Sequence, residues 1–145
     1  MPSSSLAFTF QHRLETAASP AALWRLYSDV TTWPRWDAAF EEVTLDGPFA
    51  PGSAGLLKLR GQNPLAFRIV EVEPERGFVD ETEIPGGVVR FRHRIEPLDD
   101  GRVRLTHEVE VDAPSPVAER LGEKITAGIP HTMGAIAALA EEATP

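Results

Sequence analysis

Two histidines and one aspartate stand among apolar residues in strand-like segments, and these residue types can move protons. Residues 88 to 111 read VVRFRHRIEPLDDGRVRLTHEVEV. Apolar and charged residues alternate on both sides of the central turn, which is typical of two half-buried strands. His93 and His107 fall on the apolar side, one on each strand. An imidazole held by a carboxylate can release and accept protons near neutral pH.

Turn chemistry and charge pairing predict how the strands align. The stretch Leu98–Arg102 suits a three-residue loop with glycine in the left-handed position, which places His93 opposite His107. The same register pairs Arg92 with Glu108 on the outer face, as cross-strand pairing of opposite charges favours.

The preceding hairpin brings an acid into the same row. The adjacent glycines 86 and 87 suggest a two-residue turn that places Asp80 opposite His93. We therefore predict that Asp80, His93 and His107 form one row on the inward face of three neighbouring strands. Thr82 shares that face, one step along its strand.

The elements that must position this row are seven strands, two short helices and one long helix. A helix is predicted from Ser19-Pro20 to Tyr27, followed by a shorter one that holds Trp33 and Trp36. Glycine, proline or aspartate separates the later strands. The predicted strands are Leu6–Thr16, Phe40–Asp46, Gly55–Arg60, Leu65–Glu73, Gly77–Ile84, Val88–Glu96 and Arg102–Val111.

The last segment has helical periodicity. An apolar stripe of Val117, Leu121, Ile125, Ile129, Met133 and Ile136 predicts one amphipathic helix from Pro116 to Glu142. Pro130 removes a backbone hydrogen bond, so we expect a kink near Gly128. Consecutive strands with short turns imply a twisted antiparallel sheet, whose concave face this helix can fill.

Composition excludes several classes of function. The 145 residues carry a formal net charge of −8, which argues against nucleic acid or anionic membrane as the main partner. There is no run of about 18 apolar residues, hence no predicted membrane span. Without cysteine the chain has no thiolate chemistry. We see no secretory signal and expect a cytoplasmic monomer or homodimer.

The order of these segments resembles the SRPBCC, or START-like, superfamily, most closely its bacterial polyketide cyclase/dehydrase-like members. The resemblance rests on SPAALWRLYSDVTTWPRWD, VTLDGPFAPGSAG, FRIVEVEPERGFVDET, FRHRIEPLDDGRVRLTHEVEVDAP and GIPHTMGAIAALAEE. It implies a single START-like domain over residues 1–145, of the α+β class. The implied helix-grip fold is a seven-stranded curved antiparallel sheet around the long C-terminal helix, with two short helices after the first strand and a deep apolar cavity.

The resemblance does not select one chemistry, since related proteins include aromatic polyketide cyclases, lipid and hormone carriers, coenzyme Q binders and chaperone activators. Our leading hypothesis is that the cavity between sheet and helix binds a small apolar, polycyclic or lipid-like ligand. The alternative is a cyclase or dehydratase in which His93 and His107 serve as acid and base and Asp80 orients them. A polar network that only satisfies itself also fits. A protein-interaction module would need an exposed apolar or basic face, and neither stands out.

The residues predicted to line the cavity combine the polar row with apolar wall positions. Two histidines and a carboxylate could form a facial triad for iron, but the family does not usually work that way, and we expect no metal or cofactor. His12 and His131 are expected to face solvent. The predicted lining residues are Trp36, Leu57, Leu59, Phe67, Ile69, Asp80, Thr82, Phe91, His93, His107, Ile125, Ile129 and Met133.

Overall fold

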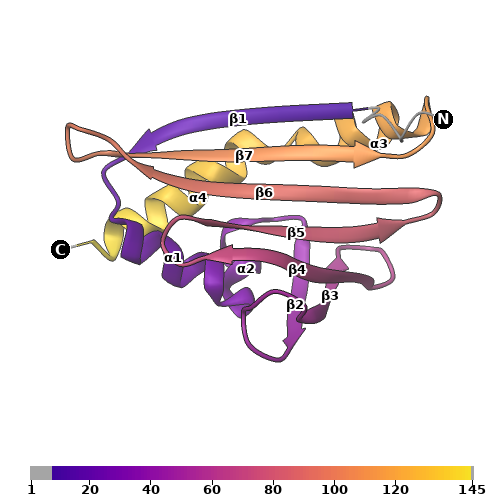
Figure 1. The fold of residues 1–145 in the computed structure, drawn as a ribbon, viewed down its shortest axis with the longest axis horizontal. Helices are drawn as coiled ribbons and strands as arrows, with labels where there is room; N and C mark the ends of the chain where they lie inside the picture. The colour runs from indigo at the N-terminus through magenta and orange to yellow at the C-terminus, as the bar shows by residue number, and fades with distance from the viewer. Residues whose placement is uncertain (1–7, 145) are drawn as a thin grey trace.

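A seven-stranded antiparallel sheet with helices packed on one side forms the fold (Figure 1). The computed structural model describes residues 8–144, so Leu6, the predicted start of the first strand, lies outside the described residues. The strand order across the sheet is β1-β7-β6-β5-β4-β3-β2. The strands are β1 (Phe8–Thr16), β2 (Phe40–Asp46), β3 (Ala54–Leu59), β4 (Leu65–Glu73), β5 (Gly77–Ile84), β6 (Gly87–Pro97) and β7 (Val103–Asp112).

Three short helical elements join β1 to β2, one more than the sequence predicts. Helix α1 (Pro20–Ser28) begins where predicted, because the Ser19 side chain accepts a hydrogen bond from the Ala22 amide at 3.1 Å. A 3-10 turn, η1 (Val30–Thr32), and helix α2 (Trp33–Trp36) follow it. The two tryptophans of α2 are buried under the sheet, only 3% and 5% exposed.

The C-terminal helix is bent, as predicted, and the bend divides it into α3 (Val117–Thr126) and α4 (Ile129–Glu142). Pro130 lies in the first turn of α4, where its missing amide hydrogen costs no helical bond. In Figure 1, α4 passes behind β7 and β6. The predicted apolar stripe is buried along α4, but Val117 at its start is 50% exposed. No helix within residues 8–144 is both long and apolar enough to cross a bilayer.

The predicted register between β6 and β7 is confirmed. His93 lies opposite His107, and Arg92 lies opposite Glu108. The loop closes through a hydrogen bond from the Leu98 amide to the Arg102 carbonyl at 2.8 Å, and Gly101 has the expected positive φ of 84°.

The predicted register between β5 and β6 is wrong by two residues. Pro85 and Gly86 occupy the turn, so Ile84 lies opposite Gly87, and Asp80 lies opposite Phe91 instead of His93. Proline presets φ for the first turn position, and Gly86 supplies the positive φ of 84° that the second requires. A shift of two residues leaves every side chain on its predicted face, because strand side chains alternate with a period of two.

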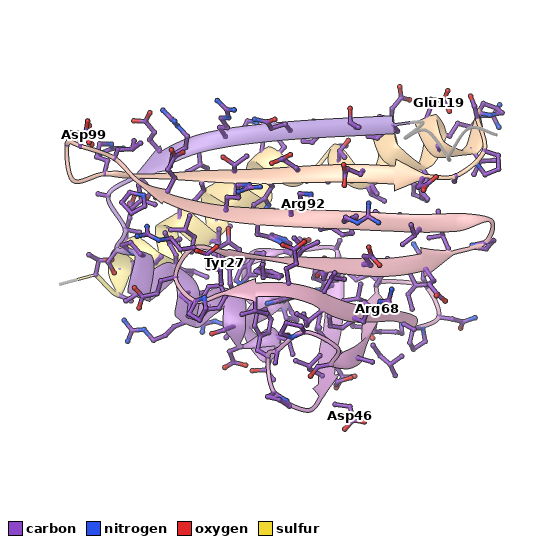
Figure 2. The ribbon with its side chains drawn as sticks, in the orientation of Figure 1. Tyr27, Asp46, Arg68, Arg92, Asp99 and Glu119 are labelled. Carbon is purple, nitrogen blue, oxygen red and sulfur yellow. The ribbon has the colours of Figure 1, made fainter. Side chains whose placement is uncertain are left out.

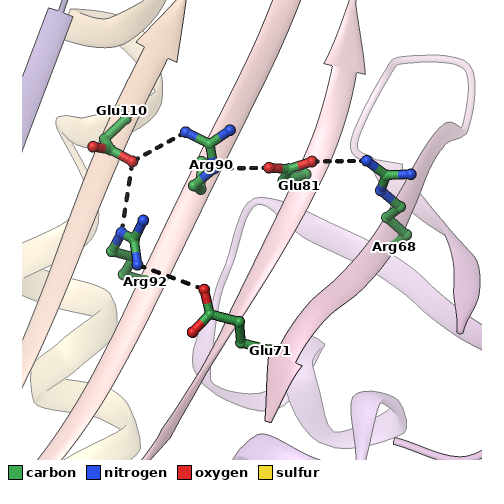
Figure 3. Close-up of polar contacts among 6 residues, drawn as sticks. All are labelled: Arg68, Glu71, Glu81, Arg90, Arg92 and Glu110. Atoms are coloured by element: carbon green, nitrogen blue, oxygen red, sulfur yellow. Dashed lines mark hydrogen bonds and ion pairs between the residues drawn. The ribbon is translucent and has the colours of Figure 1, made fainter. Parts of the chain in front are cut away.

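The outer face of the sheet carries a lattice of ion pairs (Figure 3). Glu81 pairs with Arg90 at 2.7 Å and with Arg68 at 3.2 Å, and Arg90 also reaches Glu110 at 3.3 Å. Arg92 continues the lattice to Glu110 at 3.6 Å. Arg94 pairs with Glu108 at 3.6 Å, so each arginine of the β6 row has an acidic partner within residues 8–144.

Candidate ligand-binding site

A cavity of about 440 Å³ lies between the inner face of the sheet and the helices. Its volume falls within the range of small-molecule sites, roughly 300–1,000 Å³. The apolar part of its wall comes from the helices and from β2 to β6. The apolar residues are Trp33, Trp36, Ala39, Phe40, Leu57, Leu59, Leu65, Ile84, Val89, Phe91, Leu121, Ile125 and Ile129.

Two lining residues of β5 each carry a buried polar atom that has no hydrogen-bond partner in the described part of the chain. Asp80 and Thr82 are each 4% exposed and both line the cavity from β5. Asp80 Oδ1 and Thr82 Oγ1 are buried without a hydrogen-bond partner within the described part of the chain. Buried polar groups are normally paired, so the two unpaired oxygens, on alternate residues of β5, are candidates for a hydrogen bond to a ligand or a water molecule.

Burial controls the charge of Asp80. Desolvation raises its pKa from 3.8 to about 8, and the neighbouring Glu81 charge adds to the rise. A hydrogen bond involving the Asp80 backbone works in the opposite direction but is the smaller influence. The Asp80 side chain is therefore a neutral carboxylic acid at pH 7, able to donate a hydrogen bond as well as accept one.

The histidine pair is packed against α1 and β5. The rings of His93 and His107 meet edge to face with centroids 4.6 Å apart. The Tyr27 hydroxyl lies 2.8 Å from His107 Nε2, and His93 stacks on Phe78 with a 4.0 Å centroid separation. Tyr27 comes from the helical side of the sheet, whereas Arg92 lies on its outer face (Figure 2).

Both imidazoles are neutral in the folded protein. Burial lowers the pKa of His93 to about 3, although its contact with the Phe78 carbonyl opposes this. Burial also lowers the pKa of His107, and the nearby His93 and His12 lower it further. Burial raises the pKa of Tyr27, which keeps its hydroxyl protonated and able to donate to His107 Nε2.

These contacts define which imidazole nitrogens are engaged. His93 Nδ1 lies 3.4 Å from the Phe78 carbonyl oxygen, which favours the tautomer with the proton on Nδ1. His107 Nε2 is hydrogen-bonded to the Tyr27 hydroxyl. The groups that hold the two rings are thus Tyr27 and the Phe78 carbonyl, while Asp80 lies one step farther along β5.

The predicted lining residues divide into two groups. Ten line the cavity: Trp36, Leu57, Leu59, Asp80, Thr82, Phe91, His93, His107, Ile125 and Ile129. The other three, Phe67, Ile69 and Met133, are absent from the lining and belong to the buried core, at 3%, 0% and 0% exposure. Periodicity identifies the inward face, but it does not separate packed core from cavity wall.

The sequence reasoning missed Tyr27 and misjudged His12. Tyr27 stands four residues after Leu23, so the helical spacing that predicts a buried Leu23 also places Tyr27 inward. His12 was expected to face solvent, yet it lies opposite His107 on the half-buried face of β1. The strand's alternation of Phe8, Phe10 and Leu14 was the available signal.

Charged and polar residues border the cavity near the surface. Arg60 and Gln62 follow β3, Lys124 lies on α3, and Asp37 ends α2, and all four contribute to its lining. The cavity therefore runs from the buried polar atoms of β5 to the surface between these segments. Within residues 8–144, no group of three or more histidine or acidic side chains is placed to hold a metal ion.

The sequence matches the model of a known protein family over nearly its whole length. The model of the "polyketide cyclase / dehydrase and lipid transport" family matches residues 7–141. The chain belongs to this family. No curated protein matches it.

Solved structures share the fold at low sequence identity. Norcoclaurine synthase from Thalictrum flavum, in complex with dopamine and hydroxybenzaldehyde, aligns with a TM-score of 0.74 at 18% identity, over 98% of this chain and 91% of that one. The Zhui aromatase/cyclase from Streptomyces sp. R1128 aligns with a TM-score of 0.76 at 16% identity, over 92% and 93%. A Thermobifida fusca protein solved by NMR aligns with a TM-score of 0.68 at 24% identity, over 83% of each chain. These similarities establish the seven-stranded helix-grip fold.

Proposed function

We propose that this family member binds a mainly apolar small molecule in the cavity between the sheet and the C-terminal helices. The observation that carries the proposal is the cavity itself: about 440 Å³, with a largely aromatic and aliphatic wall that reaches the surface. An apolar wall in contact with water is unfavourable, so an apolar ligand that replaces the water in a space of this size is stabilised by the hydrophobic effect. The aromatic ligands named with the norcoclaurine synthase structure are consistent with this class of occupant.

Fluorescence titration with Prodan, a neutral naphthalene ketone, tests the proposal. We expect saturable binding, because the naphthalene exchanges water for an apolar wall. The variant Ile125→Phe adds a ring at a lining position and should weaken binding at least tenfold. Leu56→Phe is the matched control, since Leu56 is 49% exposed and does not line the cavity.

Absence of saturable binding, or equal binding by Ile125→Phe and the wild type, would contradict the proposal. Native mass spectrometry of protein purified from its own host gives an independent readout. A ligand held in the cavity should appear as a mass increment under native conditions and disappear after denaturation.

A second candidate function, acid–base catalysis of a cyclisation or dehydration, is favoured by the contrast between Asp80 and His93. Asp80 is neutral with a pKa of about 8 and can donate a proton, whereas His93 is unprotonated and can accept one, although its pKa of about 3 makes it a weak base. In a dehydration, His93 would remove the proton next to a ketone while Asp80 protonates the departing hydroxyl, giving an enone and water. Opposed pKa shifts within one cavity are a signature of such acid–base pairs.

This candidate is tested with 4-hydroxy-4-(2-naphthyl)butan-2-one, whose dehydration produces an absorbing enone. Catalysis predicts turnover that His93→Ala abolishes while Prodan still binds. His131→Ala is the control, because His131 is an exposed residue of α4. Equal enone formation in the presence and absence of protein would leave ligand binding as the only proposed function.

A further inference from the structure

Asp80 and Thr82 form a two-residue polar site on the inward face of β5, and we propose that it recognises an uncharged carbonyl oxygen, as in a ketone or quinone, on the cavity's ligand. The inference rests on the proposed function and adds the chemical class of the group that is bound. Its basis is the pair of buried, unpartnered oxygens, Asp80 Oδ1 and Thr82 Oγ1, in a wall that is otherwise mostly apolar.

The spacing of the two residues suits one shared acceptor. Residues two apart on a strand point to the same face, with about 6.6–7 Å between them along the strand. Each side chain can bring an O–H group toward the midpoint of that interval. A carbonyl oxygen has two lone pairs and can accept from both donors at once. One ligand atom would then satisfy both groups that the protein leaves unpaired.

The surroundings of Asp80 favour a neutral ligand group. Its cross-strand neighbours are Ile69 on β4 and Phe91 on β6, both apolar. The pKa of about 8 keeps Asp80 protonated at neutral pH. A ligand amine would have to ionise Asp80 and form a fully buried ion pair, whose desolvation cost is high. A ligand carboxylate would bury a charge with no cation beside it.

The buried titratable groups around the cavity do not supply a cation. The imidazoles of His93 on β6 and His107 on β7 are neutral, and Tyr27 on α1 keeps its proton. The closest acid along the chain, Glu81, points to the outer face and is paired with arginines. The remaining charged lining residues are Asp37 after α2, the exposed Arg60 after β3 and Lys124 on α3, and two residues of the outer face, Arg92 and Glu108. Arg92 is paired with Glu110 and Glu71, and Glu108 is paired with Arg94.

The decisive comparison uses two fluorophores that differ only in the carbonyl group. Prodan has a propionyl group, and its analogue 6-propyl-2-(dimethylamino)naphthalene has a methylene in place of the carbonyl. Two hydrogen bonds to a buried acceptor should make Prodan bind about tenfold more tightly. Hydrogen bonding to the carbonyl also shifts Prodan emission to the red, which reports on this contact separately from affinity.

Two variants locate that preference on β5. Thr82→Val keeps the side-chain shape but removes the hydroxyl, so the ketone preference and the red shift should both decrease. Thr106→Val is the matched control, because Thr106 is a buried strand threonine that does not line the cavity. Asp80→Asn retains an N–H donor and should keep a ketone preference.

The pH dependence of Prodan affinity distinguishes a hydrogen bond from the Asp80 carboxyl from a general effect of polar residues in the wall. As pH rises through about 8, the wild-type carboxyl loses its proton and can no longer donate, so Prodan affinity should fall. In Asp80→Asn the affinity should stay constant over the same range.

The possible results distinguish failure of the proposed ligand binding from failure of the carbonyl site alone. If neither fluorophore binds, the proposed function fails together with this inference. If both bind equally, if Thr82→Val behaves like the wild type, or if wild-type affinity is flat between pH 7 and 9, only the carbonyl site is overturned. Tighter binding of 2-(aminomethyl)naphthalene than of Prodan would also overturn it, in favour of an amine site.

Discussion

At the scale of single residues, Asp80 is an acid that folding moves into a place where its charge is unstable. Its pKa in the folded protein is about 8, whereas the ordinary pKa of an aspartate is 3.8. Between these values the folded state holds a proton that the unfolded state has lost. The free energy of unfolding therefore decreases as pH rises through this window, by at most about 1.4 kcal/mol per pH unit.

Asp80→Asn should remove this dependence. The free energy of unfolding of the variant, relative to wild type, should increase steadily from pH 5 to pH 8, because only the wild type must keep a buried carboxyl protonated. Urea denaturation at several pH values measures the difference. Asp99→Asn in the exposed β6–β7 turn is the control, and its difference should be constant with pH. Parallel curves for Asp80→Asn and wild type would show that Asp80 is solvated.

Tyr27 and His107 provide a second residue-scale prediction. Tyr27→Phe leaves His107 Nε2 buried without its 2.8 Å partner, which should lower the free energy of unfolding by about 1–3 kcal/mol. In a double-mutant cycle with His107→Leu, the two effects should be less than additive, because the second change removes the orphaned nitrogen. Strict additivity in urea denaturation would mean that the two side chains are not coupled.

The sequence could predict the face of each site residue but not its neighbours. Asp80, His93 and His107 all point inward, because alternation fixes facing wherever one side of the sheet is buried. The charge pattern could not fix the β5–β6 register, since Glu81 meets an arginine whether it lies opposite Arg90 or Arg92. Only the choice of Pro85 and Gly86 as the turn residues decides between these registers.

At the scale of elements, α3 packs closely on β1 because Gly122 has no side chain at the point of contact. A methyl group on Gly122 would collide with the ring of Phe8, so the helix and the strand approach closely only because residue 122 is glycine. The kink between α3 and α4 follows from Pro130, which the sequence shows directly. The exposure of Val117 was not predictable from periodicity, because the apolar stripe does not say where the sheet beneath it ends.

A pair of glycine substitutions tests that packing. Gly122→Ala should destabilise the protein by about 1–3 kcal/mol through overpacking against Phe8. Gly134→Ala on α4 is the matched control: nothing lies within 4 Å of its added methyl, so it should stabilise by up to about 1 kcal/mol. Combining Gly122→Ala with Phe8→Ala should recover part of the loss. Equal effects of the two glycine substitutions would show that α3 is not tightly seated.

At the scale of the whole molecule, the outer face of the sheet carries ion pairs, whereas the inner face carries the core and the cavity. The outer face carries the arginine–glutamate lattice, whose partly exposed pairs each contribute little to stability. The inner face holds the core at the α4 end and the cavity beneath α3 and the kink, where Leu121 and Ile125 are only partly buried. Stability and ligand binding thus share one apolar layer between sheet and helix.

A cavity in that layer couples ligand binding to global stability. A ligand that needs both the sheet and the helix cannot bind the unfolded chain, so Prodan at 100 times its Kd should raise the free energy of unfolding by about 2.7 kcal/mol. The melting temperature should increase with Prodan concentration for wild type and for Leu56→Phe, but by about half as much or less for Ile125→Phe, because its tenfold or weaker binding leaves about 1.4 kcal/mol at most. Differential scanning calorimetry makes this measurement. An increase of the same size in Ile125→Phe would place the bound ligand outside the cavity, on a surface that does not depend on the contact between α3 and the sheet.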